Sequence, residues 1–144
     1  MSIAIDVSST VRRLLVSRAR IKAAASAALK SERVTSGMLS ITFVGRAAMS
    51  ELNQRYLGHR GPTDVISFGL GRNGGHGPVV GDIYVCVEIA RANAKRQGVS
   101  AQEELLRLVV HGTLHVLGYD HPSGATRTAS PMWRKQERIV ARVI

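Results

Sequence analysis

Alternating hydrophobic and polar positions predict four short strands along the chain. The predicted strands are 3–7, 36–45, 65–70 and 81–87. The second of these has the clearest pattern, because it is rich in β-branched residues and ends at Gly45. The glycine-rich stretch 71–78 separates the third strand from the fourth, so these two are expected to pair as a hairpin.

Apolar residues spaced three or four apart predict five helices between and after these strands. The predicted helices are 11–30, 46–58, 88–98, 103–118 and 131–144. One of Ser8, Ser9 and Thr10 is expected to cap the first helix. Ser100 is expected to cap the fourth, with Glu103 as its capping-box partner.

The order of these elements predicts an α+β fold. Strands alternate with helices and one hairpin is present, which favours a single layer with a mixed sheet of about four strands packed with helices. No repeat, long linker or composition change divides the chain, so 1–144 is expected to form one domain. In the second helix, Ala48, Met49, Leu52 and Tyr56 are expected to face inward, and Gly58 to end it.

The composition is that of a globular protein with an aliphatic core. Hydrophobic residues make up 44% and charged residues 21%, while only 4% are aromatic. A single cysteine, Cys86, excludes an intramolecular disulfide and indicates a reducing compartment. The sequence shows neither a bilayer-spanning apolar stretch nor a signal-peptide pattern at its N-terminus, so a cytoplasmic location is expected.

The charge is strongly positive. Twenty Lys and Arg against ten Asp and Glu give a net charge of +10, which favours a polyanionic partner, nucleic acid above all. The alternative is a merely solubilising surface. The surplus is largest in 1–35, where exposed basic residues are expected to contact nucleic-acid phosphates. The residues predicted to bind nucleic acid are Arg12, Arg13, Arg18, Arg20 and Lys22.

The stretch HGTLHVLGYDH, residues 111–121, holds three of the five histidines. On a helix, His111 and His115 lie on one face a turn apart, and Gly118 ends the helix so that His121 can turn back. Three histidines with an open fourth position are typical of a catalytic zinc site, although nickel, cobalt or copper would also suit them. The alternative is a pair of partly buried, hydrogen-bonded helix histidines. The other two, His59 and His76, are expected at the surface.

The residue after the first histidine separates two classes of hydrolase. Zincin peptidases place a glutamate there as general base, whereas this chain has Gly112. A phosphodiester has charged oxygens of its own that can coordinate a metal, and it depends less on such a base. Gly112 and the basic charge therefore favour phosphodiester chemistry over a metallopeptidase.

The same eleven residues resemble the signature HGxLHLxGYDH of the YbeY-type endoribonucleases, the rRNA maturation factor family. Further similar segments occur in the family's order: ELNQRYLGHRGPTDVISF (51–68), GDIYV (81–85), EELLRLVVHG (103–112) and PMWRKQE (131–137). The resemblance implies a mixed sheet packed with helices and a zinc ion held by His111, His115 and His121. It also implies a metal-dependent, single-strand-specific endoribonuclease that acts in ribosomal RNA maturation and ribosome quality control.

One position departs from the family pattern. The family usually has arginine before the glycine, in a YRG-type sequence, whereas this chain has Leu57 before Gly58. Arg55, His59 or Arg60 could supply the missing cation, and Arg60 is preferred because the turn could aim it at the site. This departure keeps open an alternative function, a ribosome-assembly factor that binds RNA or a ribosomal protein around a mainly structural metal.

Further residues have predicted roles at the site. His115, as a metal ligand, is predicted to be essential for catalysis. Asp120 is predicted either to orient a ligand histidine or to cap a turn, and Asp64 either to support the pocket or to form an Asx-type turn. Phe68 is predicted to stack a base or to pack in the core. Glu104, on the same helical face as His111, could reach a histidine ring, but it is expected to be exposed to solvent.

Overall fold

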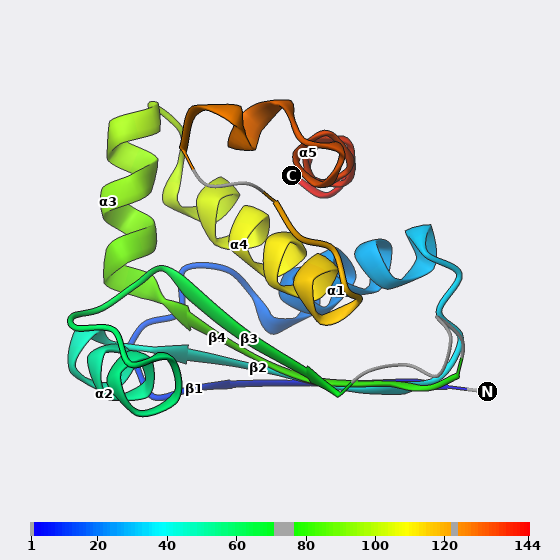
Figure 1. Cartoon of the computed structure of the whole chain (residues 1–144), viewed down its shortest axis with the longest axis horizontal. Helices are drawn as coiled ribbons and strands as arrows, with labels where there is room; N and C mark the ends of the chain where they lie inside the picture. The colour runs from blue at the N-terminus through cyan, green and yellow to red at the C-terminus, as the bar shows by residue number, and fades with distance from the viewer. Residues whose placement is uncertain (1, 71–76, 122–123) are drawn as a thin grey trace.

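A mixed four-stranded sheet forms the base of the molecule. The computed structural model describes residues 2–70, 77–121 and 124–144 (Figure 1). Its strands are β1 (Ile3–Ser9), β2 (Gly37–Val44), β3 (Val65–Leu70) and β4 (Val79–Cys86), in the order β1-β2-β4-β3. β1, β2 and β4 run parallel, whereas β3 pairs antiparallel with β4. The predicted α+β class, the four strands and the hairpin pairing are confirmed; 71–76 of the predicted hairpin loop, including His76, lie outside the described residues.

Helices cover one face of this sheet, and one helix packs on the other. The helical elements are α1 (Arg18–Ser31), α2 (Arg46–Leu57), α3 (Val87–Gln97), α4 (Ala101–Val116), the 3-10 helix η1 (Gly124–Ala129) and α5 (Pro131–Val143). Figure 1 shows α1, α4 and α5 on the same side of the strands, with α4 directly above β3 and β4. On the opposite face, Met49 of α2 packs with Val44, Ile66 and Cys86. Among the described residues, no helix is both long and apolar enough to span a bilayer.

The first helix begins later than the sequence predicts. β1 continues to Ser9, and the backbone N–H of Thr10 donates to the carbonyl of Phe43 at 2.9 Å, so the chain is still extended there. Val11, Leu14, Leu15 and Val16 then pack against the core without helical structure. The helix begins at Arg18 and is capped by Ser17, whose hydroxyl accepts from the backbone N–H of Arg20. The predicted caps at 8–10 are therefore wrong, because strand pairing extends the chain through this region.

The inward face of α2 differs from the prediction at two positions. Met49 is buried as expected, but Ala48 is exposed and Tyr56 is 56% exposed. The buried polar residue is Asn53, whose side-chain amide donates to the carbonyl of Gly61 at 2.9 Å. α2 thus packs only a narrow face against the sheet. Within that face, Asn53 holds the following loop through Gly61 and does not pack in the apolar core.

The ends of α2 and α3 and the cap of α4 largely follow the prediction. Gly58 and Gly98 end α2 and α3 in the left-handed conformation. The Ser100 hydroxyl caps α4 by accepting from the backbone N–H of Glu103 at 3.0 Å, as predicted. The carboxylate of Glu103 bonds Arg107 and does not complete the predicted capping box.

Three glycines allow α4 to lie close to the sheet. Gly69 of β3 and Gly81 of β4 are register partners, and both face Val116 near the end of α4. A Cβ atom at Gly81 would lie 2.5 Å from Cγ1 of Val116, and one at Gly69 would lie 2.8 Å from the carbonyl oxygen of Val116. On the helix side, a Cβ atom at Gly112 would lie 2.8 Å from Cγ2 of Ile83. The end of α4 therefore rests on the backbone of the β3–β4 hairpin.

We predict that Gly81→Ala destabilises the protein by about 1–3 kcal/mol, because overpacking this contact forces α4 or β4 to shift. Val116→Ala in the same chain should remove most of that cost, since it deletes both methyl groups that the new Cβ would meet. Urea unfolding of the two single variants and the double variant measures the coupling. Additive free energies of unfolding would show that the helix does not rest on Gly81.

Candidate metal centre

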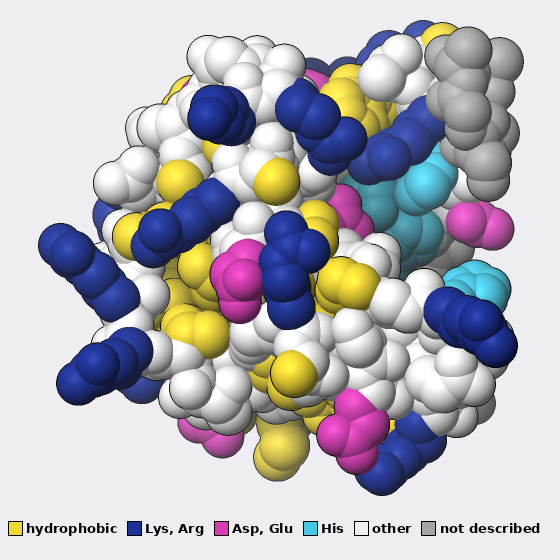
Figure 2. All heavy atoms as spheres, turned by 90° about the vertical axis from the view of Figure 1, so that its left-hand side faces the viewer, with side chains coloured by type: hydrophobic (Ala, Val, Ile, Leu, Met, Phe, Trp, Pro, Cys, Tyr) yellow, Lys and Arg dark blue, Asp and Glu magenta, His cyan; other side chains and the backbone are white. Residues whose placement is uncertain are grey.

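The structure brings together the three histidines of the HGTLHVLGYDH stretch. His111 and His115 lie on α4, and His121 lies in the chain that follows it. One ligand atom from each ring lies within 4.8 Å of the others, and the ring centroids are 4.6, 5.0 and 5.1 Å apart. Figure 2 shows histidine side chains recessed in a hollow of this face, with basic side chains around it. Three nitrogens so close together can ligate a single metal ion.

A left-handed turn brings the third histidine back. α4 ends at Val116, and Gly118 has a φ of 101°, which favours glycine. The N–H groups of Gly118 and Tyr119 donate to carbonyls of the last helical turn at 2.9 and 3.0 Å. The carboxylate of Asp120 then accepts from the backbone N–H of His121 at 2.9 Å. Asp120 thus bonds within the turn itself, and its orientation of a ligand histidine stays a prediction.

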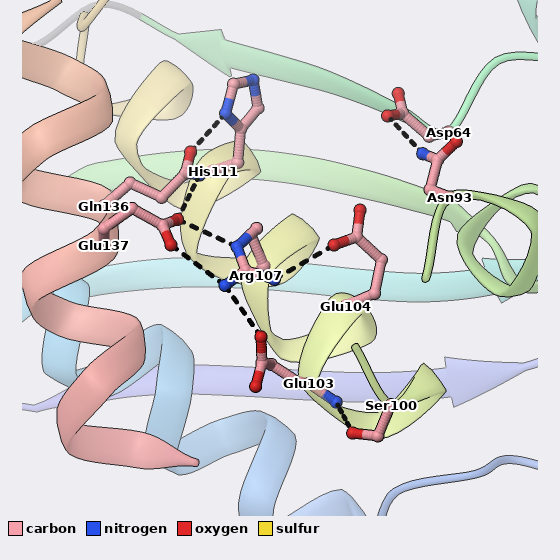
Figure 3. A network of polar contacts seen from close by, with 9 residues as sticks. All are labelled: Asp64, Asn93, Ser100, Glu103, Glu104, Arg107, His111, Gln136 and Glu137. Carbon is pink, nitrogen blue, oxygen red and sulfur yellow. Dashed lines mark hydrogen bonds and ion pairs between the residues drawn. The ribbon is translucent and has the colours of Figure 1, made fainter. Parts of the chain in front are cut away.

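A glutamine from α5 fixes the orientation of His111. Nδ1 of His111 lies 2.6 Å from Oε1 of Gln136 (Figure 3). The amide nitrogen of Gln136 donates to Glu137 at 3.0 Å, so its oxygen faces the ring. Nδ1 of His111 must then be the donor, which leaves the lone pair of Nε2 for a metal ion. Hydrogen-bond partners of this kind orient ligands and raise their basicity.

A backbone carbonyl orients His115 in the same way. Nδ1 of His115 donates to the carbonyl oxygen of Tyr119 at 2.8 Å, so its Nε2 also presents a lone pair. The Tyr119 hydroxyl donates to Glu32 at 2.5 Å, and this hydrogen bond raises the pKa of Tyr119. Lys135 of α5 bonds the other carboxylate oxygen of Glu32. The turn that holds His115 is thus attached to the end of α1 and to α5.

The electrostatic setting keeps these imidazoles neutral. Burial lowers the pKa of His111 to about 4, and the nearby charges of His115, His121 and Arg127 act in the same direction. Burial is also the largest cause that lowers the pKa of His115. Metal ligands must be deprotonated, so both side chains are in the binding form at neutral pH.

An ion-pair cluster lies beside His111. Arg107 of α4 bonds Glu103 at 3.0 Å, Glu104 at 3.2 Å and Glu137 at 2.9 Å (Figure 3). Because Glu137 also accepts from Gln136, the cluster helps to hold the partner of His111. Glu104 is only 2% exposed, and burial raises its pKa. The expectation that Glu104 faces solvent is wrong, because the neighbouring helices α3 and α5 pack against α4.

The other predicted site residues lie in the loop before β3 and on the opposite face of the sheet. Arg60 is exposed in the loop between α2 and β3. Phe68 lies on the sheet face opposite α4, with its ring 5.3 Å from Tyr56 and 6.3 Å from Tyr84. His59 is exposed, as expected.

The predicted RNA-binding residues of the N-terminal region are all exposed, in and just before α1. Arg18 donates to the carbonyl of Val7 in β1, the edge strand remote from β3. α4, which holds two of the histidines, packs over β3 and β4. The structure therefore places Arg18 beside the β1 edge of the sheet, on a helix that itself packs against α4.

Two residues beside the histidines, Gln136 and Arg127, are not predicted from the sequence. Gln136 follows Met132 by four residues and precedes Val140 by four, so it stands in the apolar stripe of the last helix. A polar residue in such a stripe indicates a buried partner. Arg127 precedes that helix in a segment with no hydrophobic periodicity, and nothing in the sequence points to its place near His111.

We predict that Gln136→Met lowers zinc affinity about 10- to 100-fold, because His111 then loses the acceptor that orients it. Competition against a chromophoric chelator measures the affinity. The matched control is Gln54→Met, at an exposed position of α2, which should bind zinc as tightly as the wild type. Unchanged zinc affinity in a folded Gln136→Met protein would show that Gln136 does not position the ligand.

Comparisons with known proteins agree with this arrangement. The family model described as Endoribonuclease YbeY matches residues 6–144. Proteins named Endoribonuclease YbeY include one from Syntrophus aciditrophicus, 32% identical over 96% of this chain and 89% of that protein. One from Bacillus licheniformis is 36% identical over 99% and 96%. Another, from Beutenbergia cavernae, is 48% identical over 58% of this chain and 60% of that protein.

The fold has a solved counterpart as well. The solution structure of TM1509 from Thermotoga maritima matches with a TM-score of 0.63 and 28% sequence identity, over 96% of this chain and 88% of that one. The family model spans nearly the whole chain and includes the histidine stretch. This chain belongs to the endoribonuclease YbeY family.

Proposed function

We propose that this chain is a zinc-dependent endoribonuclease of the cytoplasm that cleaves single-stranded RNA during ribosomal RNA maturation and ribosome quality control. One observation supports this most directly: His111, His115 and His121 converge, with two of the rings oriented so that Nε2 is available. Family membership supports RNA as the substrate. A single domain over 1–144 and ribosomal partners are part of the same proposal.

The donor set fits a catalytic metal ion. Three imidazole nitrogens leave a fourth tetrahedral position for water or substrate, which suits one zinc ion per chain; cobalt, nickel or copper would also bind. When bound, such an ion polarises a phosphoryl oxygen and lowers the pKa of water. The residues that hold it are the three motif histidines.

The surroundings favour a substrate with phosphate charge. Gly112 faces Ile83 and Val65 of the sheet, so the residue after His111 provides packing and no general base. The positive charge of Arg127 acts on His111 and His115, which places a cation beside the metal centre. Arg127 can neutralise developing phosphate charge, and Arg60 stays the predicted substitute for the family arginine at Leu57.

The basic surface outside the centre would position the substrate. Arg12, Arg13, Arg18, Arg20 and Lys22 are exposed, and a chain of charge +10 attracts RNA over a long range. Phosphate contacts of this kind fix the path of the strand without reading its sequence. Phe68 remains a predicted stacking residue on the other sheet face.

We predict that the zinc-loaded protein cleaves single-stranded RNA and leaves double-stranded RNA intact. His115→Ala should slow cleavage roughly 100-fold or more, because a metal ion supplies several kcal/mol of charge stabilisation. Gln54→Ala, at an exposed position of α2 outside the centre, is the control and should cleave normally. Gel analysis of labelled RNA measures both rates.

The ends of the products test the attacking group. Attack by water leaves a 5′-phosphate and a 3′-hydroxyl, whereas attack by the RNA's own 2′-hydroxyl leaves a 2′,3′-cyclic phosphate. We expect the first pair. RNA binding without cleavage would instead indicate a ribosome-assembly factor with a structural metal, and digestion of casein without RNA cleavage would indicate a metallopeptidase.

A further inference from the structure

A polar cavity adjoins the metal centre. It has a volume of about 170 Å³ and lies between α3, α4, η1 and α5, with His111 in its wall. The cavity has room for several water-sized groups, and therefore for the polar part of a ligand. Its polar and aromatic lining includes Asp64, Asn93, Arg96, Glu104, Arg127 and Trp133.

Most polar groups of this lining already have partners. The Asp64 carboxylate accepts from the backbone N–H of Val65 at 2.8 Å and from the side-chain amide of Asn93 at 3.2 Å. The oxygen of that Asn93 amide accepts from Arg96. Asp64 therefore lines the pocket with its carboxylate held by Val65 and Asn93, whereas Glu104 and Arg127 each have a polar atom without a partner among the described residues.

Glu104 is the acceptor that remains. One carboxylate oxygen, Oε1, accepts from Arg107 at 3.2 Å, while Oε2 has no hydrogen-bond partner among the described residues. Its neighbour Glu103 bonds the same arginine but does not line the cavity. Burial, together with the like charge of Asp64, raises the pKa of Glu104. A hydrogen-bond donor entering the cavity would stabilise this carboxylate.

Arg127 offers a buried donor. Its Nε is buried and has no hydrogen-bond acceptor among the described residues, although the guanidinium lies 5.3 Å from the ring centre of Trp133. A buried donor without an acceptor is energetically unfavourable. An anionic oxygen in the cavity would satisfy it, and its planar guanidinium suits a phosphate.

We propose that this cavity is a ribonucleotide subsite, where Glu104 accepts a hydrogen bond from a ribose 2′-hydroxyl and Arg127 donates to the neighbouring phosphate. RNA offers both groups on neighbouring carbons of the ribose, whereas DNA offers the phosphate alone. Bidentate recognition of a base would need both oxygens of Glu104, and one of them is engaged with Arg107. Glu104 therefore selects RNA over DNA beside the metal centre, an assignment that rests on the proposed function.

Paired binding measurements on the full-length, zinc-loaded protein test this subsite. Fluorescence anisotropy gives the affinities for single-stranded RNA and for DNA of the same sequence, both with hydrolysis-resistant phosphorothioate linkages. We expect Glu104→Leu to weaken RNA binding about 10- to 100-fold, as for a lost charge-assisted hydrogen bond, and to leave DNA binding within about twofold. Arg127→Gln should weaken RNA and DNA binding alike, because both contain phosphate.

The matched control is Glu103→Leu, which removes another carboxylate partner of Arg107 without altering the cavity lining. It should leave the preference for RNA over DNA unchanged. If Glu103→Leu and Glu104→Leu reduce that preference equally, Glu104 acts only through Arg107 and the subsite is wrong. Equal losses of RNA and DNA affinity in Glu104→Leu would overturn it too.

Two further measurements keep the outcomes separate. If Glu104→Leu does not unfold cooperatively, Glu104→Gln decides: a selective loss of RNA affinity supports the subsite, and no selective loss contradicts it. Cleavage of unmodified RNA by the wild type tests the proposed function independently. If the wild type cleaves RNA but the Glu104 variants keep the same preference for RNA over DNA, the proposed function stands and the subsite proposal is wrong.

Discussion

The close approach of α4 to the β3–β4 hairpin is the constraint on which the rest of the structure depends. Gly69 and Gly81 leave room for Val116, and Gly112 leaves room for Ile83. Because these glycines fix the position of α4 on the sheet, the remaining faces of α4 pack against α1, α3 and α5. The glycine that distinguishes this motif from a zincin thus has a packing reason, which is independent of catalysis.

From that position the metal centre follows in two steps. The left-handed turn at Gly118 returns His121 to the two helical histidines, and α5 supplies Gln136 to orient His111. The Arg107 cluster links α4 to α5 through buried and half-buried charges. Removing one member of a buried ion pair leaves an uncompensated charge, so the cluster makes the relative placement of the two helices specific.

Much of this fold could be predicted from sequence because its signals are local. The strand alternation, the i,i+4 histidines and the glycine at the helix end are all read within a few residues. The start of α1 was missed because β1 pairs with β2 through Ser9 and the chain then packs Val11, Leu14, Leu15 and Val16 against the core in irregular structure before the cap at Ser17. Gln136 lies 25 residues from His111, and Glu104 is buried by helices packing from elsewhere in the chain. Contacts of that kind depend on tertiary packing, which periodicity does not specify.

Titration of the purified protein with zinc, followed in parallel by metal analysis and by cleavage of single-stranded RNA, tests the central claim most directly. A three-histidine centre predicts that activity is lost on chelation and returns in proportion to bound zinc, up to about one ion per chain. Full cleavage activity in the chelated protein, or zinc bound to the His111→Ala, His115→Ala and His121→Ala variants as tightly as to the wild type, would contradict it.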